Sequence, residues 1–216
     1  MKLLEFPRWL TDPAMWVPCA GGCGDEVLKS GPRFCPGCEP KIPPAPADRS
    51  TALRRAGVPE RFRVPFEDPD NWPGLPRVDL RAWTGRPWCC VLWGDVGTGK
   101  TFLAVELLWR ALCRGDSGAW VRAAELPRLV FARDDGLERL QRARVLVIDD
   151  LARGTVSGAW PAIASVICER YDDLLPTIVT TNGAPEDLSD DLALADRFAE
   201  GYVVRVAGGS RRKSAI

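Results

Sequence analysis

The sequence predicts an α/β fold in which a five-stranded parallel sheet is flanked by helices, and two observations support this. From Trp88 onward, short apolar runs alternate with stretches of helical spacing, which is typical of a parallel sheet with helices on both faces. The runs are also apolar throughout, as expected for strands that are buried on both sides. Both patterns place the sheet in the C-terminal part of the chain.

The expected elements follow from the hydrophobic period and from the glycine and proline residues that end each element. The strands are expected at 88–94, 118–126, 144–151, 176–182 and 202–208. The helices are expected at 100–115, at 126–143 with breaks, at 157–175 and at 188–201. Residues 1–40 are expected to form a separate N-terminal module, 41–87 a proline-rich linker and pre-core segment, and 88–216 the core.

The composition excludes several classes of function. The chain of 216 residues has a formal net charge of zero, so it is not a globally basic nucleic-acid binder, and any DNA contact must come from local patches. It has no histidine, which excludes Ser-His-Asp and Cys-His catalysis. No apolar run reaches the roughly 18 residues that a membrane span needs, and no signal peptide is recognisable. We therefore expect a cytoplasmic protein without membrane contact.

A glycine-rich loop follows the first expected strand and begins the first expected helix. Its sequence, GDVGTGKT at 94–101, matches the phosphate-binding pattern G-x-x-x-x-G-K-[ST] in the strand–loop–helix context that this pattern requires. Lys100 is expected to reach the β- and γ-phosphates of ATP, and the Thr101 hydroxyl is expected to bind Mg²⁺. Backbone N–H groups and the helix dipole would surround the phosphates. The expected nucleotide-binding residues are Gly94, Asp95, Val96, Gly97, Thr98, Gly99, Lys100, Thr101 and Phe102.

The stretch VLVIDDL at 145–151 is an apolar strand that ends in two adjacent aspartates. Ligands of parallel α/β sheets bind beyond the carboxyl ends of the strands, so this strand would deliver both carboxylates to the phosphates. Asp149 is expected to hold Mg²⁺, directly or through water, and Asp150 to polarise the attacking water. The positive metal makes two neighbouring acids tolerable there. Together with the loop, these residues predict an ATPase.

The order of these motifs resembles the helicase-loader and transposition-helper branch of the AAA+ ATPases, the DnaC, DnaI and IstB group. The resemblance rests on the loop, on VLVIDDL, on PTIVTTN at 176–182 and on LADRFAEGYVVRVAGGSRR at 194–212, and it covers about residues 52–212. It implies a P-loop NTPase core of the AAA+ type, homo-oligomers in the ATP-bound state, and slow hydrolysis that DNA or a partner stimulates. The chain stops soon after the last expected strand, so no helical lid is expected, as in this branch.

The resemblance also implies roles for residues on the matching motifs. Asn182 resembles the sensor-1 residue that contacts the γ-phosphate or the attacking water, although a turn residue before glycine is the alternative. Arg197 resembles the arginine finger that reaches the nucleotide of a neighbouring subunit. Arg212 resembles a sensor-2-like arginine that acts in cis, with Arg211 as its competitor. The segment RRAGVPERF at 54–62 resembles the one that lines the adenine, with a linker helix and turn as the alternative.

The eight cysteines fall into two groups of four. The first group has the spacing C-x₃-C and C-x₂-C and is made of Cys19, Cys23, Cys35 and Cys38. Four thiolates at this spacing predict a closed structural Zn²⁺ site, whose metal supplies the folding free energy of a module with almost no core. We expect the module to dock on a partner protein, with DNA contact second. The second group is expected to be buried and apolar: Cys89, Cys90, Cys113 and Cys168.

Three functions stay open on the sequence alone. The first is an ATP-dependent loader that binds the hexameric replicative DNA helicase and delivers it onto single-stranded DNA, which the zinc module and the small size favour. The second is an IstB-like transposition helper that oligomerises on double-stranded DNA and recruits a transposase. The third is an adaptor that binds nucleotide without turnover, because Asp150 stands where the common AAA+ plan has glutamate. The candidates for a DNA-facing surface are Arg122, Arg128 and Arg133.

Overall fold

The computed structural model describes residues 16–18, 26–28, 46, 48–64, 83, 87–132, 135–151, 160–185, 192–208 and 210. Its contacts divide the chain into two compact units, Met1–Pro43 and Pro44–Ile216. Among the helices of the described ranges, none is both long and apolar enough to cross a membrane.

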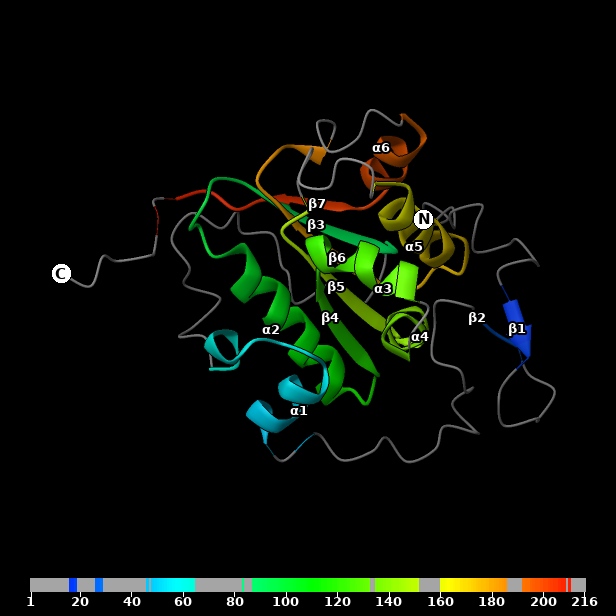
Figure 1. Cartoon of the computed structure of the whole chain (residues 1–216), viewed down its shortest axis with the longest axis horizontal. Helices are drawn as coiled ribbons and strands as arrows, with labels where there is room; N and C mark the ends of the chain where they lie inside the picture. Colours follow the sequence, from blue (N-terminus) through cyan, green and yellow to red (C-terminus); the bar gives the residue numbers. More distant parts are fainter. Residues whose placement is uncertain are drawn as a thin grey trace, which may run out of the picture. The chain divides into compact units, whose positions relative to one another are not determined.

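Five strands of the second unit form a parallel sheet in the order β4-β5-β6-β3-β7 (Figure 1). They are β3 (Cys89–Trp93), β4 (Gly118–Arg122), β5 (Val145–Asp149), β6 (Thr177–Thr181) and β7 (Tyr202–Arg205). Because all five run in the same direction, their carboxyl ends share one edge of the sheet. β3 lies between β6 and β7, so the glycine-rich loop that follows it opens inside this edge, where ligands of open α/β sheets bind. The predicted fold class is confirmed.

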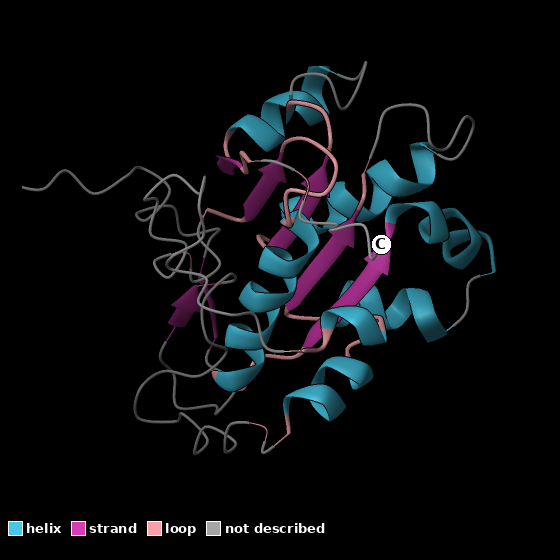
Figure 2. Ribbon diagram, turned by 90° about the vertical axis from the view of Figure 1, so that its left-hand side faces the viewer, coloured by secondary structure: helices cyan, strands magenta, loops and turns pink. Residues whose placement is uncertain are grey.

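Helices cover both faces of the sheet (Figure 2). One face is packed by α1 (Arg49–Arg55), η3 (Glu60–Phe62) and α2 (Lys100–Cys113). The opposite face is packed by η5 (Ala123–Glu125), α3 (Leu126–Ala132), α4 (Asp135–Arg142), α5 (Trp160–Asp172) and α6 (Leu192–Ala199). Within the described part of the pre-core segment, α1 and η3 pack against α2.

The alternation of side chains along the strands produces one apolar core on each face. Along β3, Cys90 faces the helix α2 and Cys89 faces the opposite layer, and both residues are 0% exposed. Burial raises the pKa of both thiols, so they stay protonated at neutral pH. These two cysteines are buried as predicted, whereas Cys113 and Cys168 lie on helices and are only partly buried.

Two strands end at least three residues earlier than the apolar pattern predicts. β4 ends at Arg122 rather than at 126, because the chain turns into η5 and then α3, whose second residue is Pro127. Proline lacks an N–H and suits the first turn of a helix, where that N–H has no partner. β7 ends at Arg205 rather than at 208, and Gly208, with a φ of 128°, turns the chain after it.

The first unit contains a short antiparallel hairpin. β1 (Trp16–Pro18) pairs with β2 (Glu26–Leu28), and Trp16 lies opposite Leu28. Residues 19–25 connect these strands and include two of the four cysteines of the predicted zinc site. All four of those cysteines lie outside the described residues.

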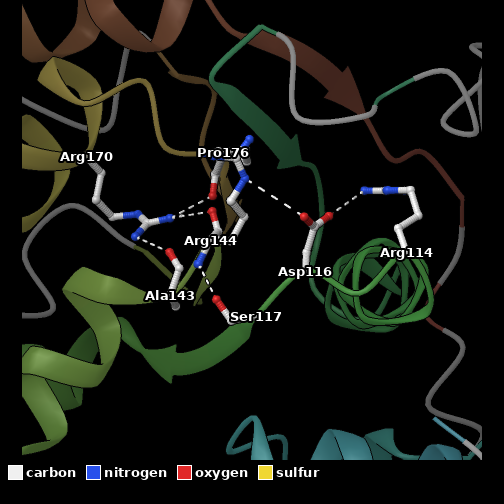
Figure 3. Close-up of polar contacts among 7 residues, drawn as sticks. All are labelled: Arg114, Asp116, Ser117, Ala143, Arg144, Arg170 and Pro176. Atoms are coloured by element: carbon white, nitrogen blue, oxygen red, sulfur yellow. Dashed lines mark hydrogen bonds and ion pairs between the residues drawn. The ribbon is translucent and has the colours of Figure 1, made fainter. Parts of the chain in front are cut away.

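Arg170, near the end of α5, is 1% exposed and ties together the amino ends of two strands (Figure 3). Its Nη1 donates to the carbonyl oxygen of Ala143 and its Nη2 to that of Pro176, both at 2.9 Å, and its Nε donates to the Thr177 hydroxyl at 2.9 Å. Ala143 precedes β5 and Pro176 precedes β6, so one guanidinium fixes the start of both strands. Burial lowers the pKa of Arg170 to about 9 and the charge of Asp173 opposes this, so the group stays charged at neutral pH.

Replacing Arg170 with methionine is expected to lower the free energy of unfolding by about 3 kcal/mol or more, because several buried carbonyl groups lose their donors. Arg142→Met is the matched control, since its ion pair with Glu138 is exposed, with side-chain exposures of 78% and 53%. That pair should contribute no more than about 0.5 kcal/mol. Urea unfolding of both variants measures the difference, and equal losses would contradict this role of Arg170.

Candidate nucleotide-binding site

The glycine-rich loop runs from the end of β3 to the first residue of α2. Gly94, Gly97 and Gly99 have φ values of 143°, 85° and 100°, in the left-handed region that favours glycine. A Cβ atom at Gly94 would lie 2.3 Å from the carbonyl oxygen of Val206, and one at Gly97 would lie 2.3 Å from Oγ of Ser210. The chain after β7 therefore packs directly against the loop, and a larger side chain at either glycine would displace it.

Lys100 begins α2, and its side chain folds back toward the loop. Its Nζ donates to the carbonyl oxygens of Gly94 at 2.7 Å and of Asp95 at 2.8 Å. The residue is only 8% exposed, so the ammonium group is held at the loop. Phosphate oxygens form stronger, charge-assisted hydrogen bonds with an ammonium group than carbonyl oxygens do. Lys100 thus has the position that a phosphate-binding lysine needs.

Asp149, the last residue of β5, is buried beside the first turn of α2. Its Oδ1 accepts hydrogen bonds from the hydroxyl groups of Thr101 and Thr180, both at 2.8 Å. Burial raises the pKa of the Asp149 carboxyl and the charge of Asp150 adds to this, whereas the two hydroxyl groups and the charge of Arg122 lower it. Because burial is the largest of these effects, the ionised carboxylate is incompletely compensated, and a bound cation would relieve that cost.

Asp150 has a φ of 60°, a left-handed conformation that costs a residue other than glycine about 1–2 kcal/mol. Its backbone N–H donates to the Thr180 hydroxyl at 2.8 Å. Its Oδ1 lies 3.4 Å from Nδ2 of Asn182, which donates to it from the turn after β6. The structure therefore brings Asp149, Asp150 and Asn182 together at the carboxyl ends of two neighbouring strands.

The oxygen atoms beside the loop suit Mg²⁺. Thr101 Oγ1 and Asp149 Oδ1 lie 2.8 Å apart, and both are hard oxygen donors. Mg²⁺ in nucleotide sites is bound by one or two protein oxygens, substrate phosphates and several waters. These two residues would hold the metal, and its charge would offset the burial of the carboxylate.

Arg197 lies away from the glycine-rich loop in the fold of its own chain, near the amino ends of the strands. Its carbonyl oxygen accepts a hydrogen bond from Trp88 Nε1 at 3.2 Å, next to the amino end of β3. Its guanidinium donates to Sγ of Cys168 and lies 4.8 Å from the ring centre of Tyr171, both on α5. Arg197 is therefore not part of its own chain's candidate phosphate site, which lies at the opposite ends of the strands.

The remaining predicted residues lie around the loop or outside the described part. The ring of Phe102, next to Thr101, contacts the ring of Phe62 edge to face with 5.0 Å between centres, so segment 54–62 reaches the first turn of α2. Val96, in the loop, is 56% exposed. Arg212 and its competitor Arg211 lie outside the described residues and follow Ser210, which contacts Gly97.

Sequence reasoning missed two residues of this site. Thr180 contacts both aspartates, and Arg122 is paired in register with Asp149 and lowers its pKa through its charge. Arg122 was expected only as a candidate for DNA contact. A signal for Thr180 exists in the sequence, because it lies two residues before Asn182 and so projects from the same side of β6.

Comparison with known protein families identifies the family of this chain. A family model described as IstB-like ATP binding protein matches residues 78–214, which is more than half of the 216-residue chain. The chain belongs to the IstB-like ATP-binding protein family. This confirms the IstB part of the resemblance seen in the motifs, and ATP binding is the property that the family's description states.

Two curated relatives of this IstB-like chain come from Bacteroides fragilis and carry the same description, an ATP-binding protein of an IS21-like insertion sequence. The first is 25% identical over 181 residues, which cover 75% of this chain and 69% of the relative. The second, from strain YCH46, is 28% identical over 119 residues, which cover 50% of this chain and 60% of the relative.

Solved structures similar to the IstB-like chain include DnaI and the DnaC helicase loader. DnaI is 24% identical with a TM-score of 0.49, and the match covers 57% of this chain and 72% of DnaI. The DnaC loader is 27% identical with a TM-score of 0.49, and the match covers 55% of this chain and 78% of the loader.

The buried charge of Asp149 predicts a stabilising substitution. Because the folded state raises this carboxyl's pKa, Asp149 stabilises the fold most when protonated, and this contribution is lost as the pH rises through the folded-state pKa. Asparagine keeps an oxygen that can accept from Thr101 and Thr180 but carries no charge. Asp149→Asn is therefore expected to raise the melting temperature of the nucleotide-free protein at pH 7, by about 2–4 °C per kcal/mol recovered.

The increase in melting temperature from Asp149→Asn should become smaller as the pH falls toward the range where the wild-type carboxyl is protonated. Asp149→Ala is the control, because it leaves two buried hydroxyl groups without their acceptor and should lower the melting temperature. Differential scanning fluorimetry across pH measures both variants, and an asparagine variant that melts below wild type at pH 7 would contradict this account of the site.

Proposed function

We propose that this chain is an ATP-hydrolysing molecular switch of DNA transposition. The observation that carries the ATPase assignment is the 2.8 Å contact between Thr101 and Asp149, beside the lysine that folds over the glycine-rich loop. A lysine, a hydroxyl and a buried carboxylate around one loop form the set of groups that a Mg²⁺-bound triphosphate needs. The two aspartates then have separate roles, one toward the metal and one toward water.

In the proposed reaction, the loop's backbone N–H groups, the start of α2 and Lys100 hold the β- and γ-phosphates. When bound at Thr101 and Asp149, Mg²⁺ supplies charge neutralisation of the phosphate oxygens. Asp150 accepts a hydrogen bond from the attacking water, and Asn182 orients it. The water oxygen bonds to the γ-phosphorus while one of its protons passes to Asp150 and on to solvent, the bond to the β–γ bridging oxygen breaks, and ADP and inorganic phosphate result. Asp150 is shorter than glutamate, so we expect slow turnover that DNA or a partner stimulates.

Two arginines would stabilise the charge that develops on the phosphates. Arg212 would act in cis. Ser210, two residues before Arg212, supports this because its Oγ lies against Gly97 of the loop. Arg197 would act in trans in an ATP-bound homo-oligomer, which requires its guanidinium to leave Cys168 and Tyr171. The adenine would lie near Phe62 and Phe102, consistent with the predicted role of segment 54–62.

The role in transposition is supported by the family and by the relatives, both named for insertion sequences of the IS21 kind. In this role the ATP-bound oligomer would bind double-stranded DNA and recruit a transposase. A surface for DNA is available on α3, where Phe131 is 75% exposed and the exposed Arg128 lies one turn before it. Arginine charge and aromatic stacking are both suited to nucleic acid.

A helicase loader is the second candidate, and the cysteine pattern of the N-terminal unit favours it. The hairpin of β1 and β2 flanks residues 19–25, which carry Cys19 and Cys23. With Cys35 and Cys38 they would bind one structural Zn²⁺ and form a docking module. As a loader, the chain would bind the hexameric replicative helicase through this module and deliver it onto single-stranded DNA.

The ATPase assignment is tested with Lys100→Ala and Arg197→Ala. Lys100→Ala should lose most affinity for ATP, because the loop loses its cation, whereas Arg197→Ala should bind ATP but hydrolyse it at least tenfold more slowly. An equal mixture of the two should regain activity, since Arg197 of one variant completes the intact loop of the other. Arg142→Ala, at an exposed arginine, is the control. Unchanged ATP affinity of Lys100→Ala would contradict the phosphate site, and a mixture without activity would contradict only the role in trans.

The two candidate partners are separated by co-purification. The ATP-bound chain is incubated with the transposase of an IS21-like insertion sequence and, separately, with a replicative helicase. We expect retention of the transposase. Lys100→Ala alone should abolish it, because a chain that binds no ATP forms no ATP-bound homo-oligomer. The loader would instead be established if the chain retained only the helicase. In that case, the Cys35→Ser/Cys38→Ser variant should lose both its one zinc ion per chain and the helicase.

A further inference from the structure

Thr180 occupies the position where the hydrogen-bonded ladder between β5 and β6 ends. The paired residues of these strands run up to Ile148 opposite Val179. The next residue on β5 is Asp149, and the next on β6 is Thr180, which is 2% exposed. Beyond the ladder, the two strands are joined through the side chain and the backbone carbonyl of Thr180.

The hydroxyl and carbonyl groups of Thr180 contact the residues that follow Ile148. Its hydroxyl donates to Oδ1 of Asp149 at 2.8 Å and accepts the backbone N–H of Asp150 at 2.8 Å. Its carbonyl oxygen accepts the N–H of Leu151 at 2.8 Å. Three consecutive residues of the acidic segment are thus held by one residue of the neighbouring strand, and the hydroxyl contributes as donor and acceptor at once.

These contacts explain how an unfavourable backbone conformation is maintained. Asp150 has a φ of 60°, and such a residue persists only where its surroundings fix it. The bonds from the N–H groups of Asp150 and Leu151 to Thr180 fix the backbone on both sides of this residue. The same hydroxyl fixes the carboxylate of Asp149, so the orientations of the two acids depend on one another.

We propose that Thr180 is a positioning residue of the ATPase site, which fixes the Mg²⁺-binding carboxylate of Asp149 and the backbone of Asp150 as one unit. The inference rests on the proposed ATP- and Mg²⁺-dependent function and adds a residue to it. It also links the site to Asn182, which lies two residues further along the chain and donates to Asp150. A shift of β6 at Asn182 would therefore move both acids through Thr180.

The chain offers a matched control on the same strand. Thr177 is also fully buried on β6, but its hydroxyl accepts from Arg170 at the opposite end of the strand. Thr180→Val and Thr177→Val each remove one buried hydroxyl at nearly constant volume, so both should lower the melting temperature. Only Thr180→Val removes a contact to the acids. Thr180→Ser keeps the hydroxyl and should restore the contact.

The test measures the affinity for a fluorescent, non-hydrolysable ATP analogue in EDTA and over a series of Mg²⁺ concentrations. In EDTA, Thr180→Val should bind the analogue as wild type does, because Lys100 and the loop are unchanged. The Mg²⁺ concentration for half-maximal enhancement of binding should rise about tenfold or more, as for the loss of a hydrogen bond to a charged group. kcat should fall with little change in KM. For Thr180→Ser and Thr177→Val, the Mg²⁺ midpoint and kcat should both stay within about twofold of the wild-type values.

Each outcome decides a different claim. An unchanged Mg²⁺ midpoint in Thr180→Val, or an equal increase in Thr177→Val or Thr180→Ser, would overturn the positioning role while leaving the ATPase intact. Failure of wild type to bind the analogue more tightly with Mg²⁺ would overturn the proposed function, and this inference with it.

Discussion

The candidate site depends on one interaction, the burial of the Asp149 carboxylate between the hydroxyl groups of Thr101 and Thr180. A carboxylate at the end of a buried strand is costly, and two neutral donors offset that cost only in part. The donors come from the helix after the glycine-rich loop and from the neighbouring strand. The charge of Asp149 therefore destabilises the nucleotide-free fold, and a bound cation can offset this. The stability of the fold is thereby linked to ligand binding.

The rest of the fold keeps these three elements in register. Parallel strands bring their carboxyl ends to one edge, and β3 lies beside β6 in the interior of the sheet. At the amino edge, Arg170 holds the starts of β5 and β6 through backbone carbonyl oxygens. At the carboxyl edge, the chain after β7 packs on glycines of the loop. A strand fixed at its start can present a side chain reproducibly at its end, and the site depends on that precision.

The sequence predicted the sheet, the loop and the strand-end residues Asp149, Asp150 and Asn182, because apolar periodicity and a spaced motif are local signals. The roles of Thr180 and Arg170 escaped because they depend on tertiary contacts. Thr180 sits in an apolar run whose threonines look alike until the strand order places one beside Asp149. Arg170 lies among charged residues at a helix end, a pattern typical of a solvated face. The zinc site stays a prediction, because its cysteines lie outside the described residues.

The central claim is that Thr101 and Asp149 form the metal side of a triphosphate site on the glycine-rich loop. A crystal structure with a non-hydrolysable ATP analogue and Mg²⁺ tests it most directly. The account predicts that the β- and γ-phosphates contact Lys100 and the loop's N–H groups, with Mg²⁺ bound to the Thr101 hydroxyl and to Asp149 directly or through water. A triphosphate bound at another surface, or a metal that contacts neither residue, would contradict it.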